Sequence, residues 1–269
     1  MCPRILQIGP FTIYGYGLML AIGFIVASYV LTLEFKRRKL DPNAANTVTL
    51  IALVAGVVGS KILYLFEHLA SFLADPIGMA FNPGGLTFYG GFILAAYSIY
   101  VYGKRKGIRF LVIADAVSPA LMIGYGIARI GCHLAGDGDY GFPTTLPWGT
   151  DYSKGTYPPS LAFRDFPEIT KNYPHGIVPD NTLCHPTPVY ELIICAIFFW
   201  ILWRLRDRLR PDGKMFMLYL MLAGLERFSI EFIRLNPRIL FGLSEAQLIA
   251  VVLMIVGAAG WRYLSTRPS

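Results

Sequence analysis

Six charged side chains interrupt long apolar stretches of this sequence, and their types and positions point to chemistry. They are Lys61, Arg129, Glu226, Arg227, Glu231 and Arg234. Ionisable groups are costly within a bilayer and by default mark binding sites or transport pathways. Two arginines that face one cavity suit a phosphate, because each guanidinium offers two parallel donors and keeps its proton at working pH. We therefore expect the buried arginines to form a site for an anionic lipid headgroup.

An alternative remains open for three of these residues. Arg227, Glu231 and Arg234 are spaced i, i+4 and i+7, so on a helix they share one face. Opposite charges at this spacing can pair, and the three would then form a ladder of ion pairs that only neutralises itself. A ladder does not account for Arg129 or Lys61, which have no oppositely charged residue at helical spacing.

Membrane helices are the elements that must position these side chains. The chain has 269 residues, of which 55% are hydrophobic and 15% charged, with a mean hydropathy of +0.51. Soluble domains carry about 25% charged residues, so this composition excludes disorder and argues against a soluble enzyme. A spanning helix needs about 20 mostly apolar residues. Seven stretches reach or approach this length: 14–33, 47–69, 86–102, 111–134, 188–205, 215–232 and 243–264.

These stretches predict an all-α, polytopic membrane protein with about seven transmembrane helices in a single domain, residues 1–269. Lysines and arginines cluster at 36–39, 104–109 and 204–214, whereas residues 68–85 contain none. Basic loops stay in the cytoplasm, so we expect the amino terminus outside and the carboxyl terminus inside. The net charge of +7 then reflects topology rather than a nucleic-acid partner. Residues 135–185 form one large hydrophilic insertion, expected on the outer side as a loop or small subdomain.

Other reactive residues near this insertion have two interpretations each. His133 is a candidate general base or a satisfied polar group at a helix end. Cys132 and Cys184 flank the insertion, where the compartment permits a disulfide, or they are small buried hydrophobic residues. The sequence contains no C-x-x-C pair or zinc spacing. Residues 136–141 lack the terminal Glu of a calcium loop, so we expect a turn there and no metal.

Four groups of residues, in order along the chain, resemble the prolipoprotein diacylglyceryl transferase family. They are GGLTFYGG at 84–91, ARIG at 128–131 with GD at 136–137, HP at 185–186 with YE at 190–191, and RF at 227–228 with EFIR at 231–234. The resemblance extends from Tyr16 to Gln247, which is most of the chain. It implies a multi-pass enzyme of the bacterial inner membrane that uses no cofactor.

The resemblance also implies a reaction. Members of this family move the diacylglyceryl group of phosphatidylglycerol to the lipobox cysteine of a preprolipoprotein, forming a thioether and releasing glycerol phosphate. The family's headgroup-binding arginines align with Arg129 and Arg227, and its essential tyrosine aligns with Tyr16. Arginines would stabilise charge on the departing phosphate, while the acceptor thiol must become a thiolate to attack. The other residues expected to bind substrate are Gly131, Asp137, Tyr89, Glu191, Glu231, Arg234 and Lys61.

Several departures from the family pattern identify the chain as a divergent member. Tyr89 replaces the family's glycine-flanked histidine. If that histidine deprotonates the thiol, another base is needed here. His133 is our candidate, because the phenol of Tyr89 has an unperturbed pKa of about 10. The other replacements are Cys132 and Ala135 for two asparagines, Asp137 for a glutamate, Ala223 for a tyrosine and Pro188 for a glutamine.

Two other functions remain open at this point. A related enzyme could use the same phospholipid with a different acceptor. A non-enzymatic transporter of lipids or small solutes could use the buried charges as its binding site. The products formed from phosphatidylglycerol and a lipobox peptide would distinguish all three functions.

Overall fold

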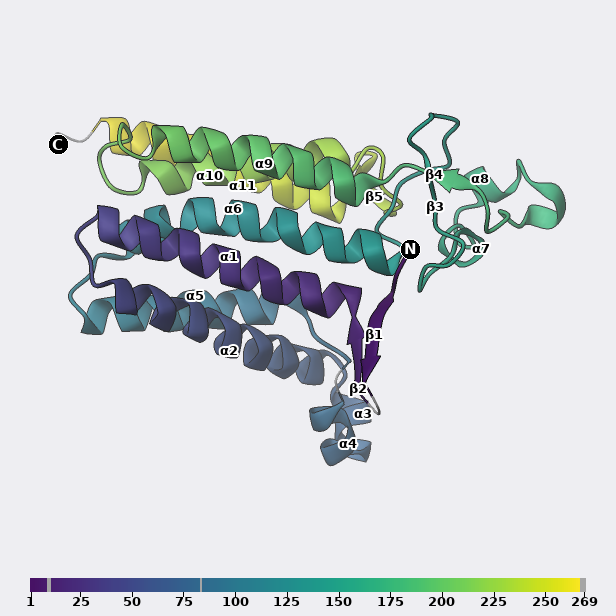
Figure 1. The fold of residues 1–269 in the computed structure, drawn as a ribbon, viewed down its shortest axis with the longest axis horizontal. Coiled ribbons are helices and arrows are strands. Elements are labelled where there is room, and N and C mark those ends of the chain that lie inside the picture. The colour runs from purple at the N-terminus through teal and green to yellow at the C-terminus, as the bar shows by residue number, and fades with distance from the viewer. Residues whose placement is uncertain (9–10, 83, 267–269) are drawn as a thin grey trace. The chain divides into compact units, whose positions relative to one another are not determined.

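The computed structural model describes residues 1–8, 11–82 and 84–266, and most of these residues are helical. A long helix covers most of each of the seven apolar stretches (Figure 1). These helices are α1 (Gly15–Arg37), α2 (Pro42–Glu67), α5 (Phe88–Arg105), α6 (Phe110–Ala135), α9 (Thr187–Leu205), α10 (Lys214–Ile230) and α11 (Glu245–Ser265).

Five helices are long and apolar enough to cross a membrane, namely α1, α2, α6, α9 and α11. Helix α5 has 18 residues, but it contains four tyrosines and ends in Lys104 and Arg105. Helix α10 has 17 residues. The expectation of a helical, polytopic membrane protein is confirmed by the five apolar helices.

Short strands are the feature that the all-α prediction did not include. Within the described residues they form three antiparallel pairs. The pairs are β1 (Arg4–Ile8) with β2 (Phe11–Tyr14), β3 (Thr150–Asp151) with β4 (Leu183–Cys184), and β5 (Arg238–Leu240) with β6 (Leu243–Ser244). Strands of two to five residues are too short to show the alternating pattern by which a strand is recognised in sequence.

Polar residues fix where several of the helices begin. The Asp41 carboxylate accepts a hydrogen bond from the N–H of Asn43, and Pro42 occupies the first turn of α2. Ser244 and Gln247 form a capping box at the start of α11. These caps satisfy backbone N–H groups that would otherwise lack partners at a helix end.

The chain separates into two compact units, and the smaller unit is Ser28–Ala116. Its main contact is the packing of α2 against α5. A Cβ atom on Gly59 would overlap the backbone of Gly90, and the converse is also true. Small residues at such positions let two helices approach closely. The short helices α3 (Leu69–Ala74) and α4 (Pro76–Phe81) follow α2.

The larger unit contains Met1–Ala27 and Val117–Ser269. Helices α10 and α11 pack closely in it, because glycines replace side chains at the contact. A Cβ atom on Gly224 would lie 2.7 Å from Ala250 O, and one on Gly257 would lie 2.7 Å from Met217 O. Between α6 and α9 in this unit, residues 136–186 form an irregular segment that we call the head. The head includes α7 (Pro159–Ala162), α8 (Pro167–Thr170) and the 3₁₀ turn η1 (Pro174–Gly176).

Candidate functional site

Three arginines of the larger unit meet at one glutamate. Glu191, in the second turn of α9, is fully buried. Arg129 Nε lies 2.9 Å from its Oε2 atom. Arg227 Nη1 and Arg234 Nη1 lie 3.6 Å and 3.3 Å from its Oε1 atom. We call these four residues, together with Asp139 and Glu231, the arginine cluster.

Each arginine reaches the cluster from a different part of the chain. Arg129 belongs to α6 and Arg227 to α10, whereas Arg234 lies beyond the end of α10 at Ile230. Removing one partner of a buried ion pair is strongly destabilising because it leaves a charge uncompensated. The carboxylates therefore fix the guanidiniums in place. Arg129 and Arg227 face the same location, as a shared headgroup site requires.

Tyr125 holds Arg129 from one turn earlier on α6. Its hydroxyl accepts hydrogen bonds from Arg129 Nε and Nη2, at 3.0 Å and 2.8 Å. The same hydroxyl donates to Glu191 Oε1 at 3.1 Å. The Arg129 guanidinium also lies over the Tyr125 ring, 4.9 Å from its centroid. Arg129 is thus held in one orientation before any ligand arrives.

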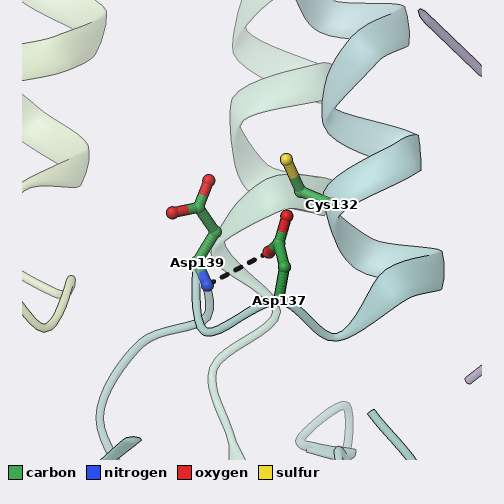
Figure 2. A group of neighbouring side chains, drawn as sticks. All are labelled: Cys132, Asp137 and Asp139. Carbon is green, nitrogen blue, oxygen red and sulfur yellow. Dashed lines mark hydrogen bonds between the residues drawn. The ribbon is translucent and has the colours of Figure 1, made fainter. Parts of the chain in front are cut away.

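Asp139 connects two of the arginines from the loop after α6. Its Oδ2 atom accepts from Arg129 Nη1, and its Oδ1 atom accepts from Arg234 Nη2. Burial alone would raise the pKa of Asp139, but the charges of Arg234 and Arg129 outweigh burial and lower it. Figure 2 shows Asp139 beside Asp137 and Cys132, with the Asp139 N–H donating to Asp137 Oδ1 at 3.3 Å.

Glu231 holds Arg227, as a ladder along α10 would require. Arg227 Nη2 lies 3.3 Å from Glu231 Oε2. The other carboxylate oxygen of Glu231 accepts from Ser244 Oγ at 2.9 Å and from the side chain of Asn236. Arg234 does not continue the ladder, because its guanidinium pairs with Asp139 and Glu191 instead.

Tyr16 lies beside an apolar cavity near the cluster. The cavity has a volume of about 470 Å³, and its lining includes Tyr16 and Asp137. Gly131 brings α6 close to this tyrosine, because a Cβ atom at Gly131 would lie 3.1 Å from Tyr16 Cα. Burial and the neighbouring charge of Asp139 raise the pKa of Asp137. The structure therefore brings three expected site residues together beside this cavity, namely Tyr16, Gly131 and Asp137.

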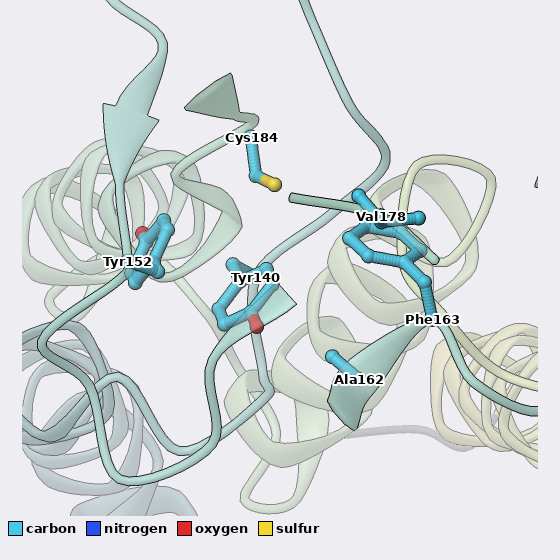
Figure 3. Close-up of a cluster of buried hydrophobic side chains, with 6 residues drawn as sticks. All are labelled: Tyr140, Tyr152, Ala162, Phe163, Val178 and Cys184. Atoms are coloured by element: carbon cyan, nitrogen blue, oxygen red, sulfur yellow. The ribbon is translucent and has the colours of Figure 1, made fainter. Parts of the chain in front are cut away.

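His133 contacts the head rather than an arginine. Its Nδ1 atom lies 3.0 Å from the hydroxyl of Tyr152. Tyr152 belongs to the buried core of the head (Figure 3) and stacks on Tyr140, with ring centroids 4.2 Å apart. In the part of the chain that the structure describes, this hydrogen bond joins His133 to the head and not to the arginine cluster. The other core residues are Ala162, Phe163, Val178 and Cys184.

Lys61 and Tyr89 belong to the smaller unit. The Lys61 ammonium donates to the backbone carbonyls of Asn82 and Gly84, at 2.7 Å and 2.8 Å. It therefore fastens the loop that leads into α5. Tyr89 lies in the first turn of α5 and is 45% exposed.

The cysteines are all free among the described residues. Cys184 is buried in the core of the head, and burial raises the pKa of its thiol to about 12. Cys132 accepts a hydrogen bond from Arg129 Nη1 at 3.4 Å. The ligand atoms of Cys132, Asp137 and Asp139 lie within 4.8 Å of one another, close enough for a metal ion. The positive charges of Arg129 and Arg234 beside Asp139 oppose a cation there.

Residues 3–263 match the family model described as prolipoprotein diacylglyceryl transferase. The chain belongs to the prolipoprotein diacylglyceryl transferase family. The family resemblance of its motifs is thereby confirmed. It is 30% identical to the phosphatidylglycerol–prolipoprotein diacylglyceryl transferase of Clostridium tetani, over 96% of this chain and 95% of the relative.

Two other relatives carry the same name. The Bifidobacterium longum subsp. infantis protein is 32% identical, over 93% of this chain and 80% of the relative. The Leptospira interrogans protein is 28% identical, over 93% of this chain and 87% of the relative. The chain thus aligns with these prolipoprotein diacylglyceryl transferases along nearly its whole length.

Sequence reasoning missed Asp139, a member of the arginine cluster, and Tyr125, which contacts Arg129 and Glu191 of that cluster. Asp139 lies in a Gly- and Asp-rich segment that reads as a solvated turn. Tyr125 lies among the apolar and small residues of α6. Its position four residues before Arg129 was the available signal, since side chains at this spacing share a helix face.

Proposed function

We propose that this chain transfers the diacylglyceryl group of phosphatidylglycerol to the cysteine thiol of a prolipoprotein. The products are a thioether-linked diacylglyceryl protein and glycerol phosphate. The observation that carries this proposal is the convergence of Arg129, Arg227 and Arg234 on Glu191, in a chain of the transferase family. The names of the relatives state the same donor and acceptor.

Arg129 and Arg227 bind the phosphate of the lipid headgroup in this proposal. Guanidiniums form paired, charge-assisted hydrogen bonds with phosphate oxygens. The Arg227 side chain is 26% exposed, compared with 13% for Arg129 and 8% for Arg234. Arg227 therefore has the most surface free for a ligand. Glu191 holds both of these arginines in position, Glu231 holds Arg227, and Arg234 adds a third guanidinium at the same glutamate.

The transfer exchanges a carbon–oxygen bond for a carbon–sulfur bond. The thiol gives its proton to a base, and the thiolate attacks the glyceride carbon that carries the phosphate. The bond between that carbon and the phosphate oxygen breaks, and its electron pair leaves with glycerol phosphate. Arg129 and Arg227 are already oriented toward the charge that grows on this oxygen, which is how preorganised donors lower a barrier.

His133 is the base that we propose for the thiol. When Nδ1 carries the ring proton, it donates to the hydroxyl of Tyr152, and Nε2 keeps a free lone pair. The hydrogen bond would hold this tautomer and the ring orientation. His133→Ala should then reduce the rate at neutral pH, and the rate should recover at high pH, where thiolate forms without a base. An unchanged rate at neutral pH would exclude His133.

The remaining site residues shape the place where donor and acceptor meet. Tyr16 and Asp137 line the apolar cavity, which we assign to the substrates, and Gly131 keeps α1 and α6 close beside it. Lys61 positions the loop that carries Gly84, and Tyr89 begins the helix that follows. We assign these two residues to lipid binding through the smaller unit.

We further propose that all seven long helices cross the bacterial inner membrane as a single domain, with the amino terminus outside and the carboxyl terminus in the cytoplasm. Basic residues in the last turns of α1, α5 and α9 support this orientation. The head then lies on the outer side. There it could meet a prolipoprotein that has crossed the membrane.

A direct assay tests the proposed reaction. Purified protein is incubated with phosphatidylglycerol and a lipobox peptide, and both the peptide adduct and free glycerol phosphate are measured. We expect both products from the wild type and neither from Arg129→Ala or Arg227→Ala. Arg164→Ala is the matched control, because Arg164 is exposed and its ion pair is with Asp165, which is also exposed.

The assay also separates the competing functions. Glycerol phosphate without the adduct would contradict the proposed acceptor. Absence of both products from folded wild-type protein would contradict the reaction itself. Wild-type rates in both arginine variants would contradict the assignment of the headgroup site.

A further inference from the structure

We propose that Asp139 occupies the place of the headgroup phosphate in the ligand-free protein, and that phosphatidylglycerol binds by displacing it. This inference rests on the proposed function, because it concerns the same arginines. It assigns Asp139 a role as a resident competitor that sets the affinity for the donor lipid.

The geometry of the Asp139 contacts is that of a bound anion. One carboxylate oxygen accepts from Arg129 Nη1 and the other accepts from Arg234 Nη2. A phosphodiester also presents two charged oxygens from one centre, and arginines bind both groups through the same fork of N–H donors. The position between Arg129 and Arg234 therefore fits either a carboxylate or a phosphate, but not both at once.

The charges of the cluster lead to the same inference. Three guanidiniums, of Arg129, Arg227 and Arg234, are paired with three carboxylates in the described part of the chain. With every carboxylate in place, these six groups have no net charge to attract a headgroup. Withdrawal of Asp139 leaves one positive charge, which matches the single negative charge of a phosphodiester. The exchange is therefore one anion for another.

Asp139 is the cluster carboxylate with room to move. Glu191 and Glu231 are fully buried, whereas the Asp139 side chain is 29% exposed. The backbone of Asp139 stays anchored, because its carbonyl accepts from Thr187 Oγ1 at 2.6 Å. A rotation of the side chain alone can thus release both arginines, without rearrangement of the loop.

A resident competitor lowers apparent affinity in proportion to the time it occupies the site. If the site is open for about one tenth of the time, the apparent dissociation constant is about tenfold higher than the intrinsic one. Removal of the carboxylate should therefore make the donor lipid bind more tightly. A carboxylate that merely positions the arginines would have the opposite effect when removed.

The test is the KM for phosphatidylglycerol in Asp139→Asn, measured in the transfer assay. We expect KM to fall about tenfold, and kcat to change less than KM. Inhibition by added glycerol phosphate should strengthen in parallel. Asp139→Glu, which keeps the charge, should show no such fall in KM. The matched control is Asp165→Asn, which removes an exposed carboxylate from an exposed ion pair.

A second variant guards against misfolding of Asp139→Asn. Gly138 has a φ of +90°, and a Cβ atom there would lie 2.9 Å from Tyr157 Cδ1. Gly138→Ala keeps the Asp139 carboxylate but disturbs its support, so KM should again fall. An unchanged or higher KM in a folded Asp139→Asn or Gly138→Ala variant would overturn the inference. Failure of the proposed function is a different result, because wild-type protein would then form no product.

Discussion

Individual side chains of the arginine cluster combine two requirements that usually conflict. A headgroup site needs strong positive charge, but unpaired charge in a protein interior is destabilising. Here Glu191 contacts all three guanidiniums, and Tyr125 fixes the orientation of one of them. The positive charges can therefore be kept before a lipid binds. Their geometry, rather than their number, should determine the rate of transfer.

Arg129→Lys tests whether geometry matters beyond charge. Lysine keeps the charge but lacks the planar fork that contacts Tyr125, Glu191 and Asp139. We expect kcat/KM to fall at least about 100-fold, the loss typical of a missing donor to a developing negative charge. The measurement is the rate of thioether formation. Arg164→Lys serves as the control, and a similar rate for Arg129→Lys and the wild type would contradict the role of the fork.

The ion pairs of Asp139 predict a pH dependence of stability. The pKa of Asp139 lies below its usual value of 3.8, so its pairing stabilises the folded protein above pH 3.8. That contribution is lost as the pH falls below 3.8 through the lowered pKa. Asp139→Asn should therefore be less stable than the wild type at pH 7, and the difference should vanish in acid. Thermal unfolding in detergent measures it.

Removal of the Asp137 charge should have the opposite effect on stability in the same experiment. Its pKa is raised by burial and by Asp139, so its ionised form is disfavoured in the folded protein. Asp137→Asn should be at least as stable as the wild type at pH 7. A loss of stability in Asp137→Asn that equals the loss in Asp139→Asn would contradict this account of the loop.

At the scale of residues, the arginines of the cluster could be predicted from the sequence, but Asp139 could not. Arg129 and Arg227 stand out because charges are rare in apolar stretches. Asp139 does not stand out, since a carboxylate in a glycine-rich loop is usually solvated. Its partners lie ten and 95 residues away in the chain, and only the folded structure brings them together.

Packed helices set the positions of these residues, and glycines determine how closely the helices pack. Gly131 on α6 faces the backbone of Tyr16 on α1, whereas a Cβ atom on Gly56 of α2 would meet nothing within 4 Å. The glycines in both helices look alike in the sequence. Which of them tolerates a side chain depends on the neighbouring helix.

Gly131→Val should displace Tyr16 from the cavity. The added side chain overpacks the contact between α1 and α6, a change that typically costs about 1–3 kcal/mol. We expect a lower melting temperature and at least a tenfold lower transfer rate (about 1.4 kcal/mol). Gly56→Val is the matched control and should retain the wild-type rate. Equal behaviour of the two variants would contradict the close approach at Gly131.

At the scale of the whole molecule, the lengths of the apolar stretches predicted the long helices but not the hairpins or the head. Most of every apolar stretch lies on a long helix, because a run of about 20 apolar residues has few other stable structures in a bilayer. The hairpins and the head depend on contacts between short segments, such as Tyr140 on Tyr152. Those contacts have no local pattern in the sequence.

The proposed orientation predicts which loops a membrane-impermeant thiol reagent can reach. Lys154 in the head and Arg208 after α9 are both exposed basic residues. In a Cys2→Ser background, Lys154→Cys should be labelled in cells whose outer membrane is permeable, and Arg208→Cys only after lysis. Cys132, Cys184 and Cys195 are buried and should stay unlabelled. Labelling of Arg208→Cys before lysis would contradict the orientation.

The most direct test of the account is the structure of the protein with phosphatidylglycerol bound. We predict that the phosphate contacts the guanidiniums of Arg129 and Arg227 and takes the place that the Asp139 carboxylate holds between Arg129 and Arg234, with that carboxylate turned away from both. A headgroup bound elsewhere, with all six charges of the cluster still paired as in the ligand-free protein, would contradict it.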